Sequence, residues 1–292
     1  MSLSQLRTFV EVYRQRSITG AARSLGLTQP AVSQHIQALE AAIERELFER
    51  HARGMVPTAA AEELAAGIGD KLDAAEAALA AARARSTDMT GVIRLIGHRD
   101  FMAEVIAPRL LPLLRSGMRI GLHSGDRDEI RNALVERQHD LGLCAYPVHD
   151  RRLRSTLIHE EQIYAVASPL VAARIMAASD LAAALASEPM LAYNLERPLV
   201  DDWLSCNGLP MLPSGPVLIG QDLRCLRLLL CEDFGWSVMP GYLCKDAIAK
   251  GELVEIPAPV ARPVHPYFLV WSPAGLRHPR VAFAKRVLSV PI

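Results

Sequence analysis

The sequence predicts an α/β protein that begins with a small helical unit, and three observations predict it. Residues 1–58 contain several helix-start signals, and residues 59–85 hold 13 alanines and no proline. Residues 91–292 hold 17 of the 19 prolines and alternate short apolar runs with helical patterns. Alanine has the highest helix propensity, and strands separated by helices are typical of mostly parallel sheets. At about 100–200 residues per domain, the chain is expected to form two or three units.

The total charge of the chain is zero, because 32 Lys and Arg residues balance 32 Asp and Glu residues. Half of the residues are hydrophobic, which excludes a disordered or collagen-like protein. No apolar run approaches the roughly 18 residues of a membrane span, and the start of the chain lacks the apolar block of a signal peptide. We therefore expect a cytoplasmic protein with no membrane partner.

A neutral total argues against a nucleic-acid partner, since proteins that bind polyanions usually carry a basic surplus. The charge is unevenly distributed, however. Residues 1–58 contain seven Arg and five acidic residues, whereas residues 59–90 contain three basic and six acidic residues. The neutral total therefore does not exclude DNA, and it predicts modest non-specific affinity.

Two short helices joined by a glycine turn are predicted in the first unit. Ser17 or Thr19 can cap the first helix. Gly26 ends it, because glycine readily adopts the positive φ of a tight turn. Thr28 then caps the second helix, whose first turn tolerates Pro30.

The second predicted helix has one apolar and one polar face. Its buried stripe is formed by Val32, Ile36, Leu39 and Ile43. The opposite face presents the uncharged side chains of Gln29, Ser33, Gln34 and Gln37. A helix fits the major groove, and Gln can pair bidentately with adenine. The pattern favours a DNA-reading helix-turn-helix over an ordinary helix pair with a solvated face.

Residues 46–58 predict a hairpin beside these helices. Leu47 and Phe48 can anchor it on the helical core. Its tip would be formed by Arg50, His51, Arg53 and Gly54. A basic tip next to a reading helix suits phosphates or the minor groove, as in a wing. The alternative is a solvated turn whose arginines are balanced by nearby glutamates.

The alanine-rich helix over residues 59–85 carries one apolar stripe, formed by Leu64, Ile68, Leu72, Ala75 and Leu79. The helix either packs on its own domain or pairs with a second copy of the chain. We favour pairing, because small residues permit close approach and neither neighbouring unit needs this helix to complete its core.

Residues 91–292 contain eight predicted strands and four predicted helices. The strands are expected at 92–97, 118–122, 141–145, 163–167, 190–193, 217–220, 236–239 and 266–271. The helices are expected at 102–114, 129–138, 223–232 and 279–289.

A family resemblance follows from residues in the first 86 positions. They are Leu6, Arg7, Phe9, Ala21, Ala22, Leu25, Thr28 to Ser33, Leu39, Glu40, Leu47 to Arg50 and Thr58. With these residues, positions 3–86 resemble the winged helix-turn-helix of LysR-type transcriptional regulators. One departure is Gln34, where many members carry Arg. The expected DNA-contacting residues are Thr28, Gln29, Pro30, Ser33, Gln34, Gln37, Arg50 and Arg53.

The resemblance also implies a domain plan. Residues 1–58 would form the winged helix-turn-helix, 59–90 the dimerising linker helix, and 91–292 an effector-binding domain similar to periplasmic binding proteins. Its first lobe is expected at 91–162 and 268–292, and its second lobe at 163–267. Such regulators bind promoter or operator DNA as homodimers or homotetramers, and a small-molecule co-inducer between the lobes changes that binding.

The candidate effector-binding residues follow predicted strands, because ligands of such folds bind at the carboxyl ends of strands. They are His98, Arg99, Asp100, Phe101, Tyr146, Tyr193, Asn194, Gln221 and Asp222. His98 and Arg99 predict an anionic or polar effector. An equally weighted alternative is that Asp100 caps the following helix and Arg99 pairs with it.

Other functions are less well supported. The sequence lacks the common hydrolase, metalloprotease, phosphate-loop and dinucleotide motifs, so we expect no enzyme, no metal and no cofactor other than the co-inducer. A cytosolic solute-binding protein is one alternative. A redox-responsive regulator using Cys225 and Cys231 is another, although a spacing of six places the two residues on different helix faces.

Overall fold

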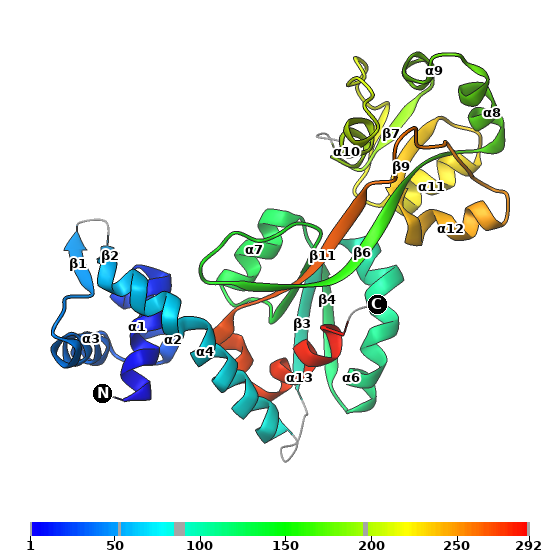
Figure 1. Cartoon of the computed structure of the whole chain (residues 1–292). Helices are drawn as coiled ribbons and strands as arrows, with labels where there is room; N and C mark the ends of the chain where they lie inside the picture. The colour runs from blue at the N-terminus through cyan, green and yellow to red at the C-terminus, as the bar shows by residue number, and fades with distance from the viewer. Residues whose placement is uncertain (1, 52–53, 85–90, 195–197, 291–292) are drawn as a thin grey trace.

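The computed structural model describes residues 2–51, 54–84, 91–194 and 198–290. Figure 1 shows three bodies: a helical head at the N-terminus, a first lobe beside it, and a second lobe joined to the first by two long strands. We call residues 2–58 the head. Among the described residues, no helix is long and apolar enough to cross a membrane.

The head contains three helices and a two-stranded hairpin. Its elements are α1 (Leu3–Gln15), α2 (Ile18–Leu25), α3 (Gln29–Ile43), β1 (Phe48–His51) and β2 (Gly54–Pro57). The predicted local signals act as expected. The Ser17 hydroxyl accepts a hydrogen bond from the Gly20 N–H, Gly26 has a φ of 65°, and the Thr28 hydroxyl accepts from the Ala31 N–H. The predicted helix-turn-helix is therefore confirmed as a local structure.

The hairpin docks on the end of α1 through its backbone. β1 and β2 pair antiparallel with Phe48 opposite Pro57 and His51 opposite Gly54. The Met55 N–H donates to the Arg16 carbonyl at 3.0 Å. Gly54 has a φ of +120°, and a Cβ there would lie 2.6 Å from the same carbonyl oxygen. Glycine is therefore required where the hairpin meets the helices.

The long helix α4 (Ala59–Ala84) completes the core of the head. Ala60 and Ala61 are buried in that core, and Leu64, Ile68 and Leu72 pack partly buried against it. The expectation that neither neighbouring unit needs this helix is therefore wrong for the head. The second half of the predicted stripe behaves differently, since Ala75 and Leu79 are exposed. Pairing of α4 between two copies stays a prediction.

The remaining strands of the described residues form one curled mixed sheet. Its order is β4-β3-β5-β11-β6-β9-β7-β8, with β10 added on β6. The strands are β3 (Val92–Gly97), β4 (Arg119–Ser124), β5 (Leu141–Cys144), β6 (Arg154–Ala167), β7 (Met190–Ala192), β8 (Leu218–Ile219), β9 (Trp236–Pro240), β10 (Val254–Glu255) and β11 (Val264–Trp271). The outer strands pair in parallel, as predicted. The central strands β6 and β11 pair antiparallel with each other and run through both lobes (Figure 1).

Each lobe has its own core. The helices of the lobes are α7 (Arg127–Val135), α8 (Pro169–Ala177), α9 (Leu181–Ser187), α10 (Pro198–Cys206), α11 (Leu223–Cys231), α12 (Gly241–Ala249) and α13 (Pro279–Leu288). In lobe 1, Leu95 faces a core with α13 and the following Ile96 faces a core with α7, because successive strand residues point to opposite faces. In lobe 2, Trp203 and Trp236 are fully buried in one continuous cluster. The boundaries of the predicted domains and lobes stay predictions.

The helix predicted at 102–114 is irregular and starts earlier than expected. It consists of α5 (Arg99–Phe101), a π-turn (Met102–Ile106), a 3-10 turn (Ala107–Leu110) and α6 (Leu111–Arg115). Pro108 and Pro112 lie at the start of the last two segments. Proline has no N–H for the bond to the carbonyl four residues earlier, which explains the change of helix type.

Candidate nucleic-acid interface and inter-lobe cleft

The polar face of α3 points into solvent. Gln29, Pro30, Gln34 and Gln37 are exposed, and Ser33 is half-buried. On the opposite stripe Val32, Ile36 and Leu39 are at most 4% exposed, as predicted, whereas Ile43 at the end of the helix is half-buried. The uncharged hydrogen-bonding groups of α3 are therefore free to meet a partner.

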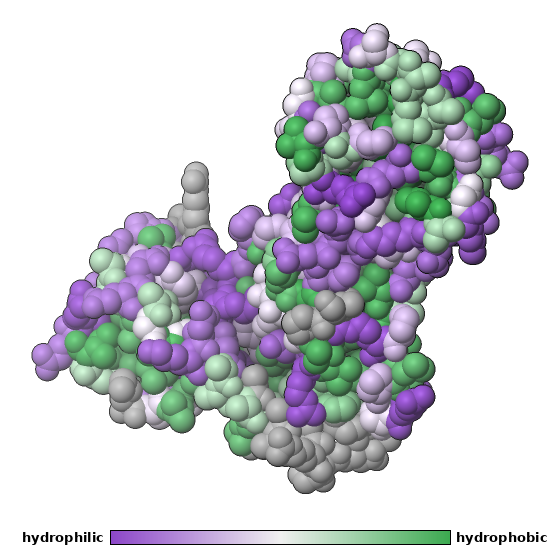
Figure 2. All heavy atoms as spheres, turned by 45° about the vertical axis from the view of Figure 1, so that its right-hand side comes forward, coloured by the Kyte–Doolittle hydropathy of each residue, from purple (hydrophilic) through white to green (hydrophobic). Residues whose placement is uncertain are grey.

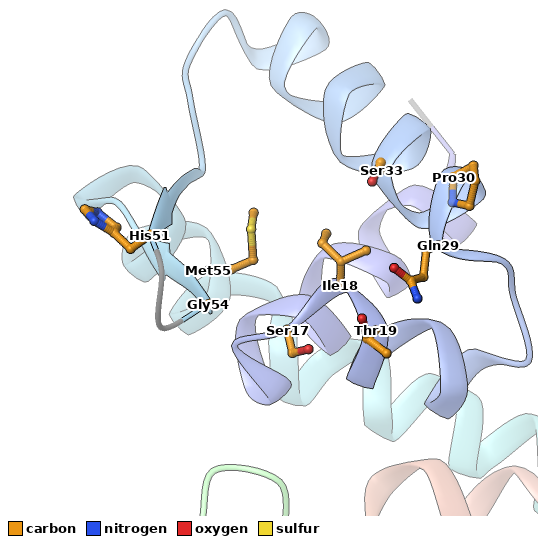
Figure 3. Close-up of a pocket in the computed structure, with 9 residues that line it drawn as sticks. All are labelled: Ser17, Ile18, Thr19, Gln29, Pro30, Ser33, His51, Gly54 and Met55. Carbon is orange, nitrogen blue, oxygen red and sulfur yellow. The ribbon is translucent and has the colours of Figure 1, made fainter.

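A groove of about 760 Å³ lies between α3, the start of α2 and the hairpin (Figure 3). Its lining residues are Ser17, Ile18, Thr19, Gln29, Pro30, Ser33, His51, Gly54 and Met55. Figure 3 shows that three separate segments contribute these side chains. Three of the predicted contact residues, Gln29, Pro30 and Ser33, lie in this groove. Sequence reasoning considered Ser17 and Thr19 as helix caps and missed their place on the same surface.

The remaining predicted contact residues are distributed around this groove. The Thr28 hydroxyl caps α3, accepting from the Ala31 N–H at 3.4 Å, and the residue is exposed. Arg50 lies in β1 opposite Met55. Arg53 lies outside the described residues. At the wing, His51 Nε2 lies 3.1 Å from a carboxylate oxygen of Glu49.

A second, much smaller cavity of about 30 Å³ lies between the two lobes. Its lining residues are His98, Asp100, Ala145, Tyr146, Tyr193, Leu199, Leu223, Pro240, Tyr242, His265 and Tyr267. Pockets for drug-sized ligands measure about 300–1,000 Å³. The cavity between the lobes is therefore far too small for such a ligand, and the cleft is closed in this structure. Of the predicted effector residues, His98, Asp100, Tyr146 and Tyr193 line it. Arg99, Phe101, Asn194, Gln221 and Asp222 do not.

Asp100 joins the two lobes. It is 3% exposed, and its Oδ2 accepts a hydrogen bond from the Leu223 N–H at 3.1 Å, at the first residue of α11 in the other lobe. Arg224 Nε lies 3.5 Å from its Oδ1. Burial, reinforced by the nearby charge of Asp222, raises the pKa of Asp100 to about 6. Asp100 therefore caps a helix across the cleft.

This finding corrects the alternative in which Asp100 caps its own helix and Arg99 pairs with it. Residue 98 is the N-cap of α5 and forms no side-chain cap bond. Arg99 Nη2 donates to the Ser124 hydroxyl at 3.3 Å, and its Nη1 lies 4.0 Å from Asp222 Oδ2. The Arg99 side chain is 53% exposed and lies outside the cavity lining.

His98 is held as a neutral imidazole. Its Nδ1 lies 3.3 Å from the Tyr193 hydroxyl, and its Nε2 is buried without a hydrogen-bond partner among the described residues. Burial lowers the pKa of His98 to about 4, so the ring is uncharged at neutral pH. Among the residues that the structure describes, the lining of the cavity contains no Lys or Arg. The residue pair expected to hold an anion therefore supplies no positive charge to this cavity.

The back wall of the cavity is aromatic. The hydroxyls of Tyr242 and Tyr267 lie 3.0 Å apart, and Phe101 stacks on Tyr267 with ring centroids 3.8 Å apart. Phe101 therefore supports the wall from behind. Burial raises the pKa of both tyrosines well above the usual value. Sequence reasoning missed Tyr242 and Tyr267, because α12 was not predicted and the antiparallel β11 brings its residues to the cleft from the opposite direction.

Comparison with known proteins settles the family. Residues 3–62 match the family model of the bacterial regulatory helix-turn-helix protein, lysR family, and residues 88–288 match that of the LysR substrate binding domain. The chain belongs to the LysR family. The HTH-type transcriptional regulator AbaB of Streptomyces antibioticus is 33% identical over 291 residues, which are 97% of this chain and 96% of that protein.

Other proteins similar to this LysR-family chain are also transcriptional regulators by name. The HTH-type transcriptional regulator CbbR of Rhodospirillum rubrum is 32% identical over 61% of this chain and 60% of its own length. The structure of CrgA, a LysR-type transcriptional regulator from Neisseria meningitidis, superimposes with a TM-score of 0.60 at 21% identity and covers 99% of this chain and 98% of its own. That likeness shows that the fold is shared along the whole chain.

Charged residues connect the head of this LysR-family chain to α4 and lobe 1. Asp73 on α4 accepts hydrogen bonds from Arg7, at 2.9 Å, and from Arg14. Glu76, one turn along, contacts both Arg7 and Arg277 of lobe 1, the latter at 3.1 Å. Burial favours a higher pKa for Asp73, but the bonds from the two arginines outweigh it and lower that pKa. The ion pairs form a continuous link from α1 to the segment after β11.

The two cysteines considered for redox sensing lie on α11. Cys225 is exposed and Cys231 is half-buried, and both are free thiols. Six residues of α-helix place them about 240° apart around the axis. Burial also raises the pKa of Cys231, which lowers its thiolate fraction. These features disfavour a disulfide between them.

Proposed function

We propose that this LysR-family chain is a sequence-specific DNA-binding transcriptional regulator that binds promoter or operator DNA as a homodimer or homotetramer. The observation that carries the proposal is the exposed polar face of α3 beside a groove shared with the wing. Such a face can read base edges in the major groove while neighbouring groups hold phosphates. The similarity of nearly the whole chain to the transcriptional regulator AbaB supports the proposal that this chain regulates transcription.

We assign two kinds of DNA contact. Gln29, Ser33, Gln34 and Gln37 can exchange hydrogen bonds with bases, and Thr28 and Pro30 set the start of α3 against the backbone. Arg50 and Arg53 of the wing would neutralise phosphates or enter the minor groove. Because the head carries a surplus of only two positive charges over its first 58 residues, specificity depends strongly on the uncharged face and on the dimer geometry.

The assignment is tested by selecting binding sites from random double-stranded DNA with the full chain. We expect enrichment of a two-fold symmetric site with half-sites in adjacent major grooves. Recovery of no common sequence would overturn the proposal of sequence-specific binding. Light scattering of the complex then distinguishes a dimer from a tetramer.

We further propose that a small polar metabolite, bound between the lobes, modulates DNA binding. His98 Nε2, which is buried and has no hydrogen-bond partner in the described parts of the chain, can form a hydrogen bond with such a ligand, and the tyrosine hydroxyls can form more. Because the described part of the lining carries no Lys or Arg, it favours a polar ligand over an anion. Binding requires the cleft to open from its volume of about 30 Å³, which would break the bond between Asp100 and the Leu223 N–H.

Isothermal titration against neutral polar compounds, amines and organic acids tests the effector proposal. Binding of a neutral polar compound or an amine, abolished by His98→Phe, is the expected result. If organic acids alone bind, the proposed ligand class is wrong, whereas the DNA-binding assignment is unaffected.

A further inference from the structure

A third cavity lies at the junction between the head and lobe 1, away from both sites already described. It measures about 640 Å³, within the size range of small-molecule sites. Its lining residues are Arg14, Gln15, Arg16, Val148, His149, Asp150, Arg151 and Arg152. Three of them come from the end of α1 and five from the segment between β5 and β6. Figure 2 shows hydrophilic residues on both sides of this junction.

The lining is strongly basic, with four arginines and a histidine against one aspartate. Two of the arginines are already neutralised. Arg14 donates to both carboxylate oxygens of Asp73. Arg152 donates to Asp150 through two nitrogens, at 2.9 and 2.7 Å. The other two arginines of the lining are Arg16, which contacts Glu62 through one nitrogen, and Arg151.

Arg16 is incompletely paired. Its Nη2 lies 3.3 Å from one oxygen of Glu62, whose other oxygen accepts from the Tyr13 hydroxyl. Its Nη1 is buried and has no hydrogen-bond partner among the described residues. The Arg16 guanidinium lies 4.5 Å from the centre of the Tyr13 ring, which fixes its position at the end of α1.

Arg151 lines the same cavity from lobe 1. It is exposed and takes part in no ion pair found within the described ranges. The hydrogen bond from Tyr13, and then the positive charges of Arg16 and Arg151, lower the pKa of Glu62, so both guanidinium groups act on the same place. The single carboxylate of Glu62 is therefore the acidic group that offsets the charges of both arginines.

We propose that this junction cavity binds a small multivalent anion of the phosphate class, which Arg16 of the head and Arg151 of lobe 1 hold together. Guanidinium groups match phosphate oxygens with two parallel hydrogen bonds. Since the two arginines belong to different bodies, the anion relieves their repulsion and fixes the head against lobe 1. This second ligand site is separate from the inter-lobe cleft and does not depend on the effector proposed there.

A small anion fits this cavity better than the phosphates of DNA. Figure 1 shows α3 on the side of the head away from lobe 1, whereas the cavity lies between the head and lobe 1. DNA held by α3 would therefore lie on the other side of the head from the segment that contributes Arg151.

Inorganic pyrophosphate is the probe, titrated into the full chain at constant ionic strength. We expect saturable binding that Arg151→Gln and Arg16→Gln each weaken about tenfold or more, since each removes a positive charge and a charge-assisted hydrogen bond. The matched control is Arg115→Gln, which changes the charge equally at an exposed arginine on α6. Binding to the control should equal that of the unchanged protein.

Three results would overturn the proposal. The first is that pyrophosphate binds no more tightly than chloride does at equal ionic strength. The second is that Arg115→Gln weakens pyrophosphate binding as much as Arg151→Gln does. The third is that neither Arg16→Gln nor Arg151→Gln changes the affinity for pyrophosphate. Hydrogen exchange adds an independent readout. Pyrophosphate should protect both the end of α1 and residues 148–152, and protection of one side alone would contradict a site shared by the two bodies.

Discussion

Replacing Asp100 with Asn should stabilise the protein at neutral pH and should stabilise it much less in acid. The pKa of Asp100 is raised from 3.8 to about 6, chiefly by burial. The folded state therefore binds more protons than the unfolded state between these values, and stability falls as the pH rises through them. The full shift corresponds to about 3 kcal/mol at pH 7.5, and about 1 kcal/mol is already lost at pH 4.5.

The amide of Asn keeps an acceptor for the Leu223 N–H, and the attraction between Arg224 and the carboxylate is already contained in the raised pKa of Asp100. The gain in the free energy of unfolding should therefore be about 3 kcal/mol at pH 7.5 and about 1 kcal/mol at pH 4.5. For a domain of roughly 200 residues, such a gain at pH 7.5 corresponds to a Tm increase of roughly 6–12 °C.

Thermal melting of the full chain at the two pH values measures the effect. Asp246→Asn, an exposed aspartate on α12 without an ion pair in the described parts of the chain, is the matched control and should not change the Tm at either pH. A variant Asp100→Asn that melts below the unchanged protein at pH 7.5, or whose gain is the same at both pH values, would refute the reasoning. A higher Tm of Asp100→Asn at pH 7.5 would mean that the carboxylate of Asp100 destabilises the folded protein. Groups with strongly shifted pKa values cluster at functional sites.

Two further substitutions test the head. Asp73→Asn removes the carboxylate that two buried arginines share, and should lower the free energy of unfolding by about 3–5 kcal/mol in urea titrations near neutral pH. Because the pKa of Asp73 is lowered in the folded protein, the difference in stability between the variant and the unchanged protein should shrink as the pH falls below about 4. Gly54→Ala would place a Cβ 2.6 Å from the Arg16 carbonyl at a positive φ, and should cost about 1–3 kcal/mol and weaken binding to all DNA sequences. Gly67→Ala, which has open space on α4, should leave stability equal or slightly higher; equal effects of the two glycine variants would contradict the docking of the wing.

Local signals in the sequence predicted the head well, because each acts within a few residues. The caps at Ser17 and Thr28, the turn at Gly26 and the stripe from Val32 to Leu39 all lie where the pattern placed them. The strand at Val92–Gly97 was predicted with its observed bounds for the same reason, since its apolar run is interrupted by one exposed residue, Arg94.

Contacts between distant segments were less predictable. In the first half of β6, Leu157 and Ile158 are the two apolar residues among polar and charged ones, so residues 154–162 gave no continuous apolar signal although they pair with β11. Arg99 follows a strand, as a ligand-binding residue should, yet the turn of α5 directs it to Ser124, while Asp100 enters the cleft. Successive side chains of a helix point about 100° apart around its axis. The expectation that ligand-binding residues follow strands does not say which of two neighbouring residues, Arg99 or Asp100, points into the cleft.

The central claim is that the uncharged face of α3 reads DNA bases. It is tested by measuring the affinity of the full chain, Gln29→Ala and Arg50→Ala for a selected site and for a shuffled DNA of the same composition. Gln29→Ala should lose about 1–3 kcal/mol of binding on the selected site and little on the shuffled one, because a bidentate base contact is removed. Arg50→Ala should weaken both complexes alike. Equal loss on both DNAs for Gln29→Ala would contradict the claim.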